Sequence, residues 1–285
     1  MERLIFLLLV PFIAMVFDGI RRKIIARMQN RIGPPIIQPI YDFFKLMGKE
    51  NLTAKESNNI FFRISPYIYA LLTFGVFFLL PLNLIAFEFD YLLLVYLFIA
   101  SSFFIIVGGV ASRNPFAILG SLREMILMIF YELAFLIAVV TFFFYANVTT
   151  VGAYSMFGLP ALPIASLVLF GVAFIELRVT PFEIPEASSE IIAGAEIEYT
   201  GPRLAFFKLA GEMKALGFLM LTVFLTLGVT GILELLGLSL LLLLVLSFCQ
   251  ATTPRYRIDQ GVRWYILFFI LSLIELIRVV YFVSA

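Results

Sequence analysis

The stretch Tyr91–Ala111, YLLLVYLFIASSFFIIVGGVA, runs for 21 residues without a single charged side chain. An apolar run of about 20 residues is long enough to cross the hydrocarbon core of a bilayer as an α-helix. A helix suits that environment because its backbone N–H and C=O groups bond to one another within the segment. The stretch therefore predicts a membrane-spanning helix, and it sets the class of the whole chain.

Similar runs recur along the 285 residues, of which 62% are hydrophobic and only 14% are charged. Soluble domains carry about 25% charged residues, so this composition excludes an ordinary soluble protein. The alternating pattern of a membrane β-barrel is absent from the sequence. We predict an all-α, polytopic integral membrane protein with about eight transmembrane helices, at residues 3–20, 67–86, 91–111, 124–146, 162–179, 206–228, 231–250 and 264–283.

Basic residues gather in the loops on one side of the predicted membrane. Of the 20 Lys and Arg residues, all except Arg3 and Arg278 fall in or beside these loops. Because positive charge marks the cytoplasmic side, we expect a multi-pass protein of the plasma membrane with both termini outside. Neither a soluble appendage nor a linker interrupts the pattern, which predicts a single membrane domain over residues 1–285. Its amphipathic cytoplasmic loops are expected at about 21–66, 112–123, 180–205 and 251–263.

The chain contains one cysteine, Cys249, and no histidine. It cannot supply a four-thiolate iron–sulfur site or a histidine-ligated haem, and a zinc site is equally short of ligands. A glycine-rich phosphate loop is also absent from the sequence. We therefore expect no catalytic residue, metal or cofactor on this chain. Its expected partners are the lipid bilayer and other protein subunits, not nucleic acid.

The first long loop contains QNRIGPPIIQPIYDFFKLMGKE, residues 29–50. Its adjacent prolines, Pro34 and Pro35, must interrupt a helix because proline lacks the N–H donor and restricts the residue before it. After Pro39 the pattern becomes amphipathic, with charges on one helical face: Asp42, Lys45 and Lys49. A helix lying on the membrane surface explains this second half. It does not explain the polar and Gly-Pro-Pro residues before it.

The second long loop and its flanks, residues 176–212, are rich in acid. The stretch reads ELRVTPFEIPEASSEIIAGAEIEYTGPRLAFFKLAGE and contains seven glutamates. Pro185 suits the first position of a short helix and Gly194 its end. The alternative is a solvated acidic loop. We favour a functional chain of carboxylates, because the acids alternate with apolar side chains such as Phe182 and Ile184.

Ionisable residues also fall inside the predicted spans. Glu132 lies near the middle of one span and Glu176 late in another. Such groups are costly in a membrane and usually face a bundle interior or an aqueous path, where they relay protons. Glu132 has no basic residue within one helical turn, which favours a relay. Glu275 and Arg278 are i, i+3 neighbours, for which a structural ion pair is at least as good an interpretation, while Glu124 lies at a span end and can reach the interface.

The two loop motifs together resemble the H subunit of respiratory complex I, which is called subunit 1 of NADH dehydrogenase in mitochondria. In that family the protein joins a hydrophilic redox arm to the membrane arm, and its buried acids lead toward antiporter-like subunits. The resemblance implies contacts with the redox arm through Gln29, Arg31, Gly33, Pro34, Gln38, Pro39, Asp42, Lys45, Lys49 and Glu50. It implies a buried proton path through Glu132, Glu176, Glu183, Glu186, Glu190, Glu198 and Glu212.

The motifs depart from the complex I pattern at several places. Only three residues separate Gly33-Pro34 from Gln38-Pro39, where complex I carries a longer insert. The other departures are Glu183 in place of aspartate, Ser188 and Ser189 in place of an acid, and Val179 in place of an arginine. These differences argue against a quinone site. The short first loop is similar to the related subunit of energy-converting, membrane-bound nickel–iron hydrogenases and of ferredoxin-linked sulfane reductases.

This second resemblance implies a membrane-arm subunit that anchors the redox arm and couples electron transfer to proton or sodium translocation. The partners it implies are hydrogenase-like large and small subunits, an iron–sulfur subunit on the cytoplasmic face, and antiporter-like membrane subunits. Those partners would carry the iron–sulfur clusters and, in a hydrogenase, the nickel–iron centre. Two alternatives stay open: a quinone-binding subunit of a complex I-type oxidoreductase, and a passive membrane anchor for the redox arm.

Overall fold

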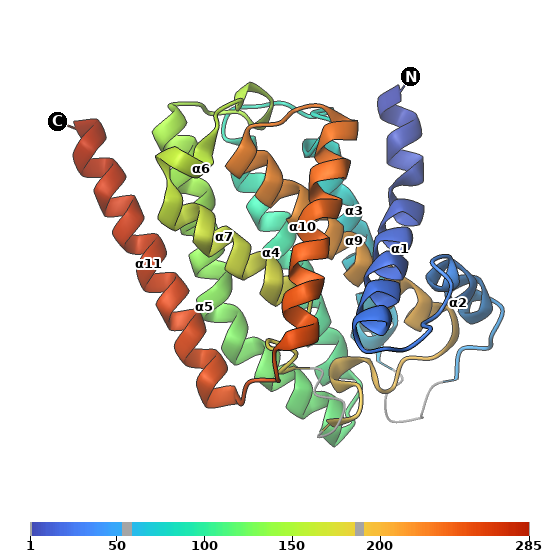
Figure 1. The fold of residues 1–285 in the computed structure, drawn as a ribbon. Helices are drawn as coiled ribbons and strands as arrows, with labels where there is room; N and C mark the ends of the chain where they lie inside the picture. The colour runs from blue at the N-terminus through green and yellow to red at the C-terminus, as the bar shows by residue number, and fades with distance from the viewer. Residues whose placement is uncertain (1, 53–58, 186–190, 285) are drawn as a thin grey trace.

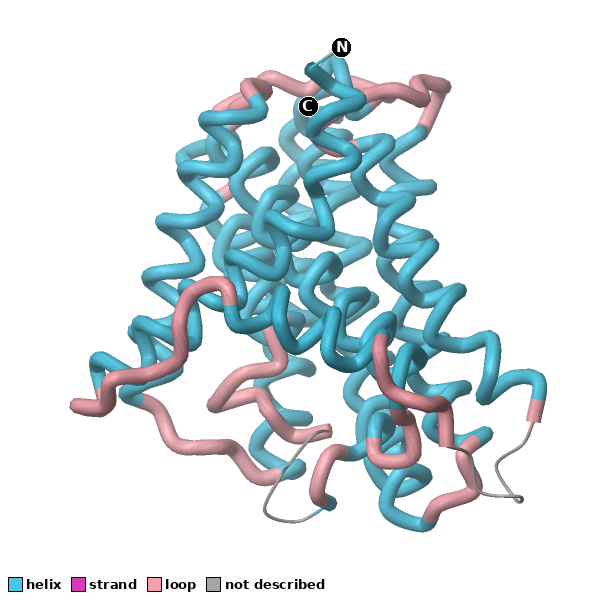
Figure 2. The backbone as a smooth tube through the Cα atoms, turned by 90° about the vertical axis from the view of Figure 1, so that its right-hand side faces the viewer, coloured by secondary structure: helices cyan, strands magenta, loops and turns pink. Residues whose placement is uncertain are grey.

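The computed structural model describes residues 2–52, 59–185 and 191–284. Over these ranges the chain is all-helical and has no strands, as predicted. Long helices run side by side between two ends of the molecule, and both chain termini lie at the same end (Figure 1). The helices fill the middle of the bundle and the loops gather at its two ends (Figure 2). We call the end that carries residues 29–52, 177–185 and 191–200 the loop end.

In the described ranges, seven helices are long and apolar enough to cross a membrane. They are α1 (Glu2–Met28), α3 (Ile60–Leu79), α4 (Asp90–Ala111), α5 (Pro115–Ala146), α9 (Gly201–Leu227), α10 (Ile232–Thr252) and α11 (Ile258–Ser284). The uncharged stretch Tyr91–Ala111 thus forms a single helix, α4, which begins one residue earlier, at Asp90.

The fifth predicted span, 162–179, is shorter than expected. Its place is taken by a helical turn, α6 (Gly158–Ala161), followed by α7 (Pro163–Glu176), which has 14 residues. At about 1.5 Å per residue, α7 is only about 21 Å long, less than the roughly 30 Å of a hydrocarbon core. The chain turns away at Arg178, whose φ is 50°. As a result α7 ends part-way through the bundle (Figure 1), and Glu176 lies inside the protein.

Several helices begin earlier than their apolar runs predicted. The predicted loop 112–123 is mostly the start of α5, because Asn114 caps that helix by accepting a 2.9 Å hydrogen bond from the N–H of Phe116, and proline suits the first helical position. In the same way α9 begins at Gly201, so that its lysines are helical rather than part of a loop. Hydropathy located the ends of the apolar runs, where charged residues begin. The helices themselves extend beyond these ends into the charged segments.

The amphipathic helix predicted in the first loop is present as α2 (Gln38–Met47), packed against α1 and α9. Gly33 precedes it with a φ of +69°, and a Cβ at this position would lie 2.6 Å from the Cβ of Ala26. The loop end is then tied to the start of α9. The Thr200 hydroxyl accepts a hydrogen bond from the N–H of Leu52 and donates one to its carbonyl, each at 2.9 Å.

The helix at the centre of the bundle is α9, of which 83% is buried over its most apolar window. It packs against α1, α3, α7 and α10. Aromatic rings fill the space around it: the Phe98 ring lies 4.1 Å from that of Phe218, between centroids, and 5.7 Å from that of Phe135. This packing fixes the position of polar side chains that α9 carries at mid-height.

Candidate functional site

A buried lysine occupies the middle of α9. Lys214 has 13 helical residues before it and 13 after it, and its side chain is 1% exposed. Its Nζ lies 2.7 Å from Glu176 Oε2 at the end of α7. It also donates a 2.5 Å hydrogen bond to the Ser102 hydroxyl of α4. A charged lysine this far from either end of a span requires such partners, because an isolated charge in the membrane interior is costly.

The same serine connects the lysine to a second carboxylate. The Ser102 hydroxyl donates a 2.5 Å hydrogen bond to Glu132 Oε1 on α5. Ser102 is fully buried, and Glu132 and Glu176 are 4% and 5% exposed. Each glutamate keeps one buried oxygen, Glu132 Oε2 and Glu176 Oε1, without a hydrogen-bond partner among the described residues. We call Glu132, Ser102, Lys214 and Glu176 the central cluster; its members come from four different helices.

A second ion pair lies beside the central cluster. Arg178, just past the end of α7, places Nη2 2.8 Å from Glu124 Oε1 on α5. The hydroxyl of Tyr131 donates to the same oxygen at 3.3 Å. These three residues and Glu176 line one small cavity. Charged side chains are therefore continuous from the central cluster to the loop that follows α7.

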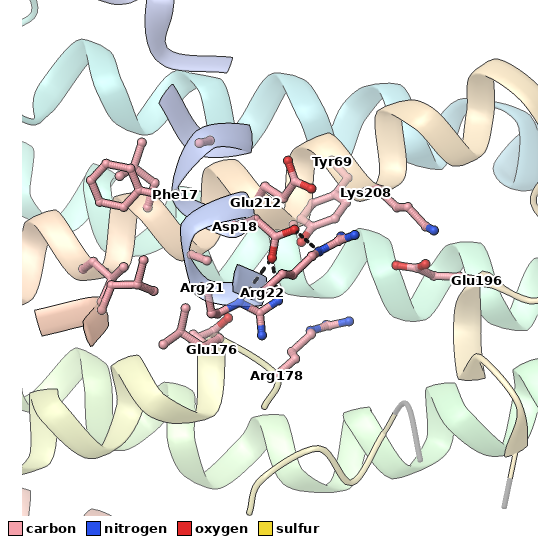
Figure 3. A pocket seen from close by; sticks show the side chains of 17 residues that line it. Phe17, Asp18, Arg21, Arg22, Tyr69, Glu176, Arg178, Glu196, Lys208 and Glu212 are labelled. Carbon is pink, nitrogen blue, oxygen red and sulfur yellow. Dashed lines mark hydrogen bonds and ion pairs between the residues drawn. The ribbon is translucent and has the colours of Figure 1, made fainter. Parts of the chain in front are cut away.

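A second cavity, of about 220 Å³, adjoins both Glu176 and Arg178 (Figure 3). Side chains from α1 and α9 point into it. On α1, Asp18 lies 2.5 Å from both Arg21 Nη2 and Arg22 Nε. From α9, Glu212 faces the same space. The cavity is polar and large enough for several water molecules, so Glu176 borders a space that water can fill.

A neighbouring cavity of about 240 Å³ extends this space toward the loop end. It is lined by Asp42, Lys45 and Lys49 of the first loop and shares three residues with the cavity of about 220 Å³: Arg22, Lys208 and Glu212. One oxygen of Glu212, Oε2, is buried without a hydrogen-bond partner among the described residues. The two cavities therefore place a row of charged side chains between α2 and the central cluster.

The structure brings together three of the seven predicted path glutamates: Glu132, Glu176 and Glu212. Glu183 points elsewhere and pairs with Arg255 at 2.8 Å, with both side chains about a quarter exposed. Glu198 accepts a 2.6 Å hydrogen bond from Asn114 Nδ2. The remaining two, Glu186 and Glu190, and most of the short helix predicted around them lie outside the described residues.

The residues predicted to contact a redox arm gather at the loop end. Those with exposed side chains are Gln29, Arg31, Lys45, Lys49 and Glu50; Gly33, Pro34, Gln38 and Asp42 are half-buried, and Pro39 is buried. Gln38 Nε2 donates a 3.0 Å hydrogen bond to Asp42 Oδ1, which orders the first turns of α2. The set forms a surface on one end of the molecule, and its contact with another subunit stays a prediction.

Sequence patterns did not reveal the basic member of the central cluster. Lys214 falls among the charges that follow the second loop, although the helix start at Gly201-Pro202 would have placed it in the middle of a span. Glu132 has no basic neighbour on its own helix, but the lysine approaches it from α9 through Ser102. No local pattern marks a contact between residues 112 positions apart.

Two further polar groups play structural roles. The predicted pairing of Glu275 with Arg278 is confirmed at 2.6 Å, and Arg278 also donates to the carbonyl of Ala161 at 2.9 Å, which joins α11 to α6. Before α9, the ring of Tyr199 stacks on that of Phe62 at 4.3 Å. Burial raises the pKa of the Tyr199 hydroxyl above its ordinary value, so this tyrosine stays neutral.

Comparison with known proteins shows which family the chain belongs to. The family model described as NADH dehydrogenase matches residues 1–280. The H subunit of the NADH-quinone oxidoreductase of Geobacillus kaustophilus (strain HTA426) is 33% identical over 283 residues, covering 89% of this chain and 85% of that protein. The corresponding subunit of Syntrophotalea carbinolica (strain DSM 2380 / NBRC 103641 / GraBd1) is 35% identical over 271 residues, covering 84% and 82%.

A solved structure has the same fold. One chain of the membrane-bound sulfane sulfur reductase, an archaeal respiratory membrane complex, superposes with a TM-score of 0.83 at 24% identity, covering 97% of this chain and 98% of that chain. The family that the two loop motifs resemble is the one that the whole-chain match identifies. This all-helical membrane protein belongs to the NADH dehydrogenase subunit 1 family, which includes the H subunits of NADH-quinone oxidoreductases.

Proposed function

We propose that this chain is the membrane-arm subunit that anchors a redox arm and couples electron transfer to proton or sodium translocation in a membrane-bound respiratory complex. The single observation that carries the proposal is the central cluster. Two acids and a lysine are held at mid-height of a helical bundle, next to polar cavities that reach toward the loop end. Buried charges of this kind mark ion pathways in membrane proteins.

The loop end is where we place the redox arm. Positive charge on this side favours an orientation in which the loop end faces the cytoplasm. The protein would then lie in the plasma membrane with both termini outside. The exposed polar residues of the first loop are available for contact with hydrogenase-like large and small subunits and an iron–sulfur subunit. Those partners would carry the iron–sulfur clusters and any nickel–iron centre. Antiporter-like membrane subunits would receive the charge displacement laterally.

The energies involved are of a suitable size. Moving one elementary charge against a membrane potential of 100 mV costs about 2.3 kcal/mol. Leaving one partner of a buried ion pair uncompensated costs about 3–5 kcal/mol. Electron transfer that alters a charge near the two cavities can therefore change which carboxylate of the cluster is ionised, and this change is large enough to drive one ion across the membrane.

We favour a sulfane reductase or hydrogenase type of complex over a quinone-linked one. The match to the sulfane reductase chain covers 97% of this chain and 98% of that chain, whereas the matches to the two quinone-linked relatives cover 84% to 89% of this chain and 82% to 85% of those proteins. The first loop is short, and Asp18 in the cavity of about 220 Å³ is ion-paired with Arg21 and Arg22. The identities of 33% and 35% to the two quinone-linked relatives support the quinone-binding alternative.

Substitution of Glu212 tests the coupling. In the purified complex reconstituted into vesicles, Glu212→Gln is expected to lower ion translocation at least about tenfold while redox turnover with an artificial acceptor is retained. Glu234→Gln, at an exposed position in the first turn of α10, is the matched control. Unchanged translocation in the Glu212 variant would favour the passive anchor. Turnover that requires added quinone would favour the complex I-type alternative.

A further inference from the structure

We propose that Lys214 is a switching cation, whose ammonium exchanges its counter-ion between Glu176 and Glu132, with Ser102 as the bridge to Glu132. The inference rests on the proposed function and deepens it, because it names the residue that links the two carboxylates. Lys214 acts on the proton path by positioning charge, and it keeps its own protons throughout.

The contacts around the ammonium provide both positions. Lys214 Nζ lies 2.7 Å from Glu176 Oε2 and 2.5 Å from Ser102 Oγ. The Ser102 hydroxyl in turn donates at 2.5 Å to Glu132 Oε1. An ammonium has three N–H donors, so it can hold the serine while it gains or loses the bond to Glu176. The ring of Phe218, 5.7 Å from Nζ to its centroid, borders the same space.

The charges of the cluster allow two states with the same net charge. With both glutamates ionised beside one lysine, the dry interior would carry one net negative charge, which is costly. The cluster is therefore neutral in two ways: Glu176 ionised with Glu132 protonated, or Glu132 ionised with Glu176 protonated. Going from the first to the second state, Glu176 takes up one proton and Glu132 releases one. The number of protons on the cluster is unchanged.

The surroundings give this exchange a direction. Glu176 borders the cavity of about 220 Å³, and its buried Oε1 has no hydrogen-bond partner among the described residues, so this oxygen is available to carry a proton. Glu132 does not line that cavity and lies behind Ser102 on α5. The nearby cation Arg178 also lines this cavity and is paired with Glu124 at 2.8 Å. Lys214 therefore lies between an acid that borders this cavity and an acid that does not.

The hydroxyl of Ser102 is the point at which to test the switch. Ser102→Ala removes the bridge to Glu132 but leaves the ion pair between Lys214 and Glu176. The matched control is Ser101→Ala, on the preceding residue of the same helix, because Ser101 is equally buried and donates to the carbonyl of Phe98 in its own helix, at 2.6 Å. Both variants would be made in the intact complex and reconstituted into vesicles, with wild type alongside.

We expect Ser102→Ala to lower ions transported per electron pair at least about tenfold, with redox turnover and the amount of assembled complex unchanged. Ser101→Ala is expected to transport within about twofold of wild type. A purely structural ion pair predicts no difference between the two, and equal transport would overturn the proposal. Absence of transport in wild type would instead overturn the proposed function.

A double variant gives an independent test. Lys214→Met combined with Glu176→Gln removes the buried cation together with its counter-ion, so that no uncompensated charge remains in the bundle. We expect this variant to assemble and to turn over, yet to transport at least about tenfold less than wild type. Transport at the wild-type rate would show that the pair has only a structural role, and the proposal would be wrong.

Discussion

The guanidinium of Arg178 lies 2.8 Å from the carboxylate of Glu124, and both side chains are largely withdrawn from solvent, at 17% and 6% exposure. The pair joins the first residues after α7 to α5. Because the substitution removes a buried negative charge that contacts Arg178, Glu124→Gln is expected to lower the stability of the complex by about 3 kcal/mol. The measurement is the midpoint of thermal inactivation of the purified complex in detergent.

The control for this variant is Glu183→Gln. Its pair with Arg255 has a similar length, 2.8 Å, but is about a quarter exposed. A surface pair of this kind contributes about 0–1 kcal/mol. Equal shifts in the two variants would show that burial does not set the contribution of these ion pairs.

Gly33 is expected to be sensitive to any side chain. Its φ of +69° is unfavourable for other residues, and a Cβ would lie 2.6 Å from that of Ala26. Gly33→Ala should therefore cost more than about 1 kcal/mol and reduce the yield of assembled complex, because the loop before α2 is displaced. Gly48→Ala is the control in the same loop, since its φ is −82° and a Cβ there makes only ordinary contacts. A normal yield for Gly33→Ala would contradict this interpretation.

The tie between the first loop and α9 can be measured directly. Thr200→Val removes both hydrogen bonds to Leu52 while preserving the shape of the side chain. With each bond contributing about 1 kcal/mol, amide exchange at Leu52 is expected to become faster by about tenfold or more. Hydrogen exchange read by mass spectrometry provides the measurement. Thr253→Val, which loses only a bond within its own helix end, should leave that amide unchanged.

Asn114 has two roles that substitutions can separate. It caps α5 through Phe116 and donates to Glu198 from the second loop. Asn114→Ala should cost about 1 kcal/mol or more through loss of the cap. Asn114→Ser retains a capping oxygen but is too short to reach Glu198, so it should recover helix stability without restoring the link to the second loop. Thermal inactivation measures the change in helix stability. Protease sensitivity of the second loop measures the loss of its link to Asn114.

Membrane topology could be predicted from the sequence because it depends on local features. An uncharged run such as Tyr91–Ala111 has one low-energy structure in lipid, and Pro34-Pro35 followed by an amphipathic pattern specified α2. The early start of α5 was missed, since hydropathy does not register a cap such as Asn114. The short length of α7 was missed as well. The predicted span ran to Val179, and the turn at Arg178 is a backbone conformation that composition does not encode.

The candidate site was only partly predictable for a related reason. Glu132 and Glu176 were evident because acids are conspicuous in apolar runs. Lys214 and Ser102 were not, since their importance comes from tertiary contacts between α9 and α4. A serine in a span commonly bonds to its own helix, as Ser101 does, and only the fold shows that Ser102 connects two helices.

The early end of α7 has a mechanical consequence for the whole assembly. If α7 spanned the whole bilayer, a displacement at the membrane surface could reach the midplane only if the entire helix slid or tilted as a rigid rod. Here a short run of non-helical backbone reaches that depth, so that a displacement of a few ångströms in whatever rests on it can arrive at Glu176 while every long helix stays in place.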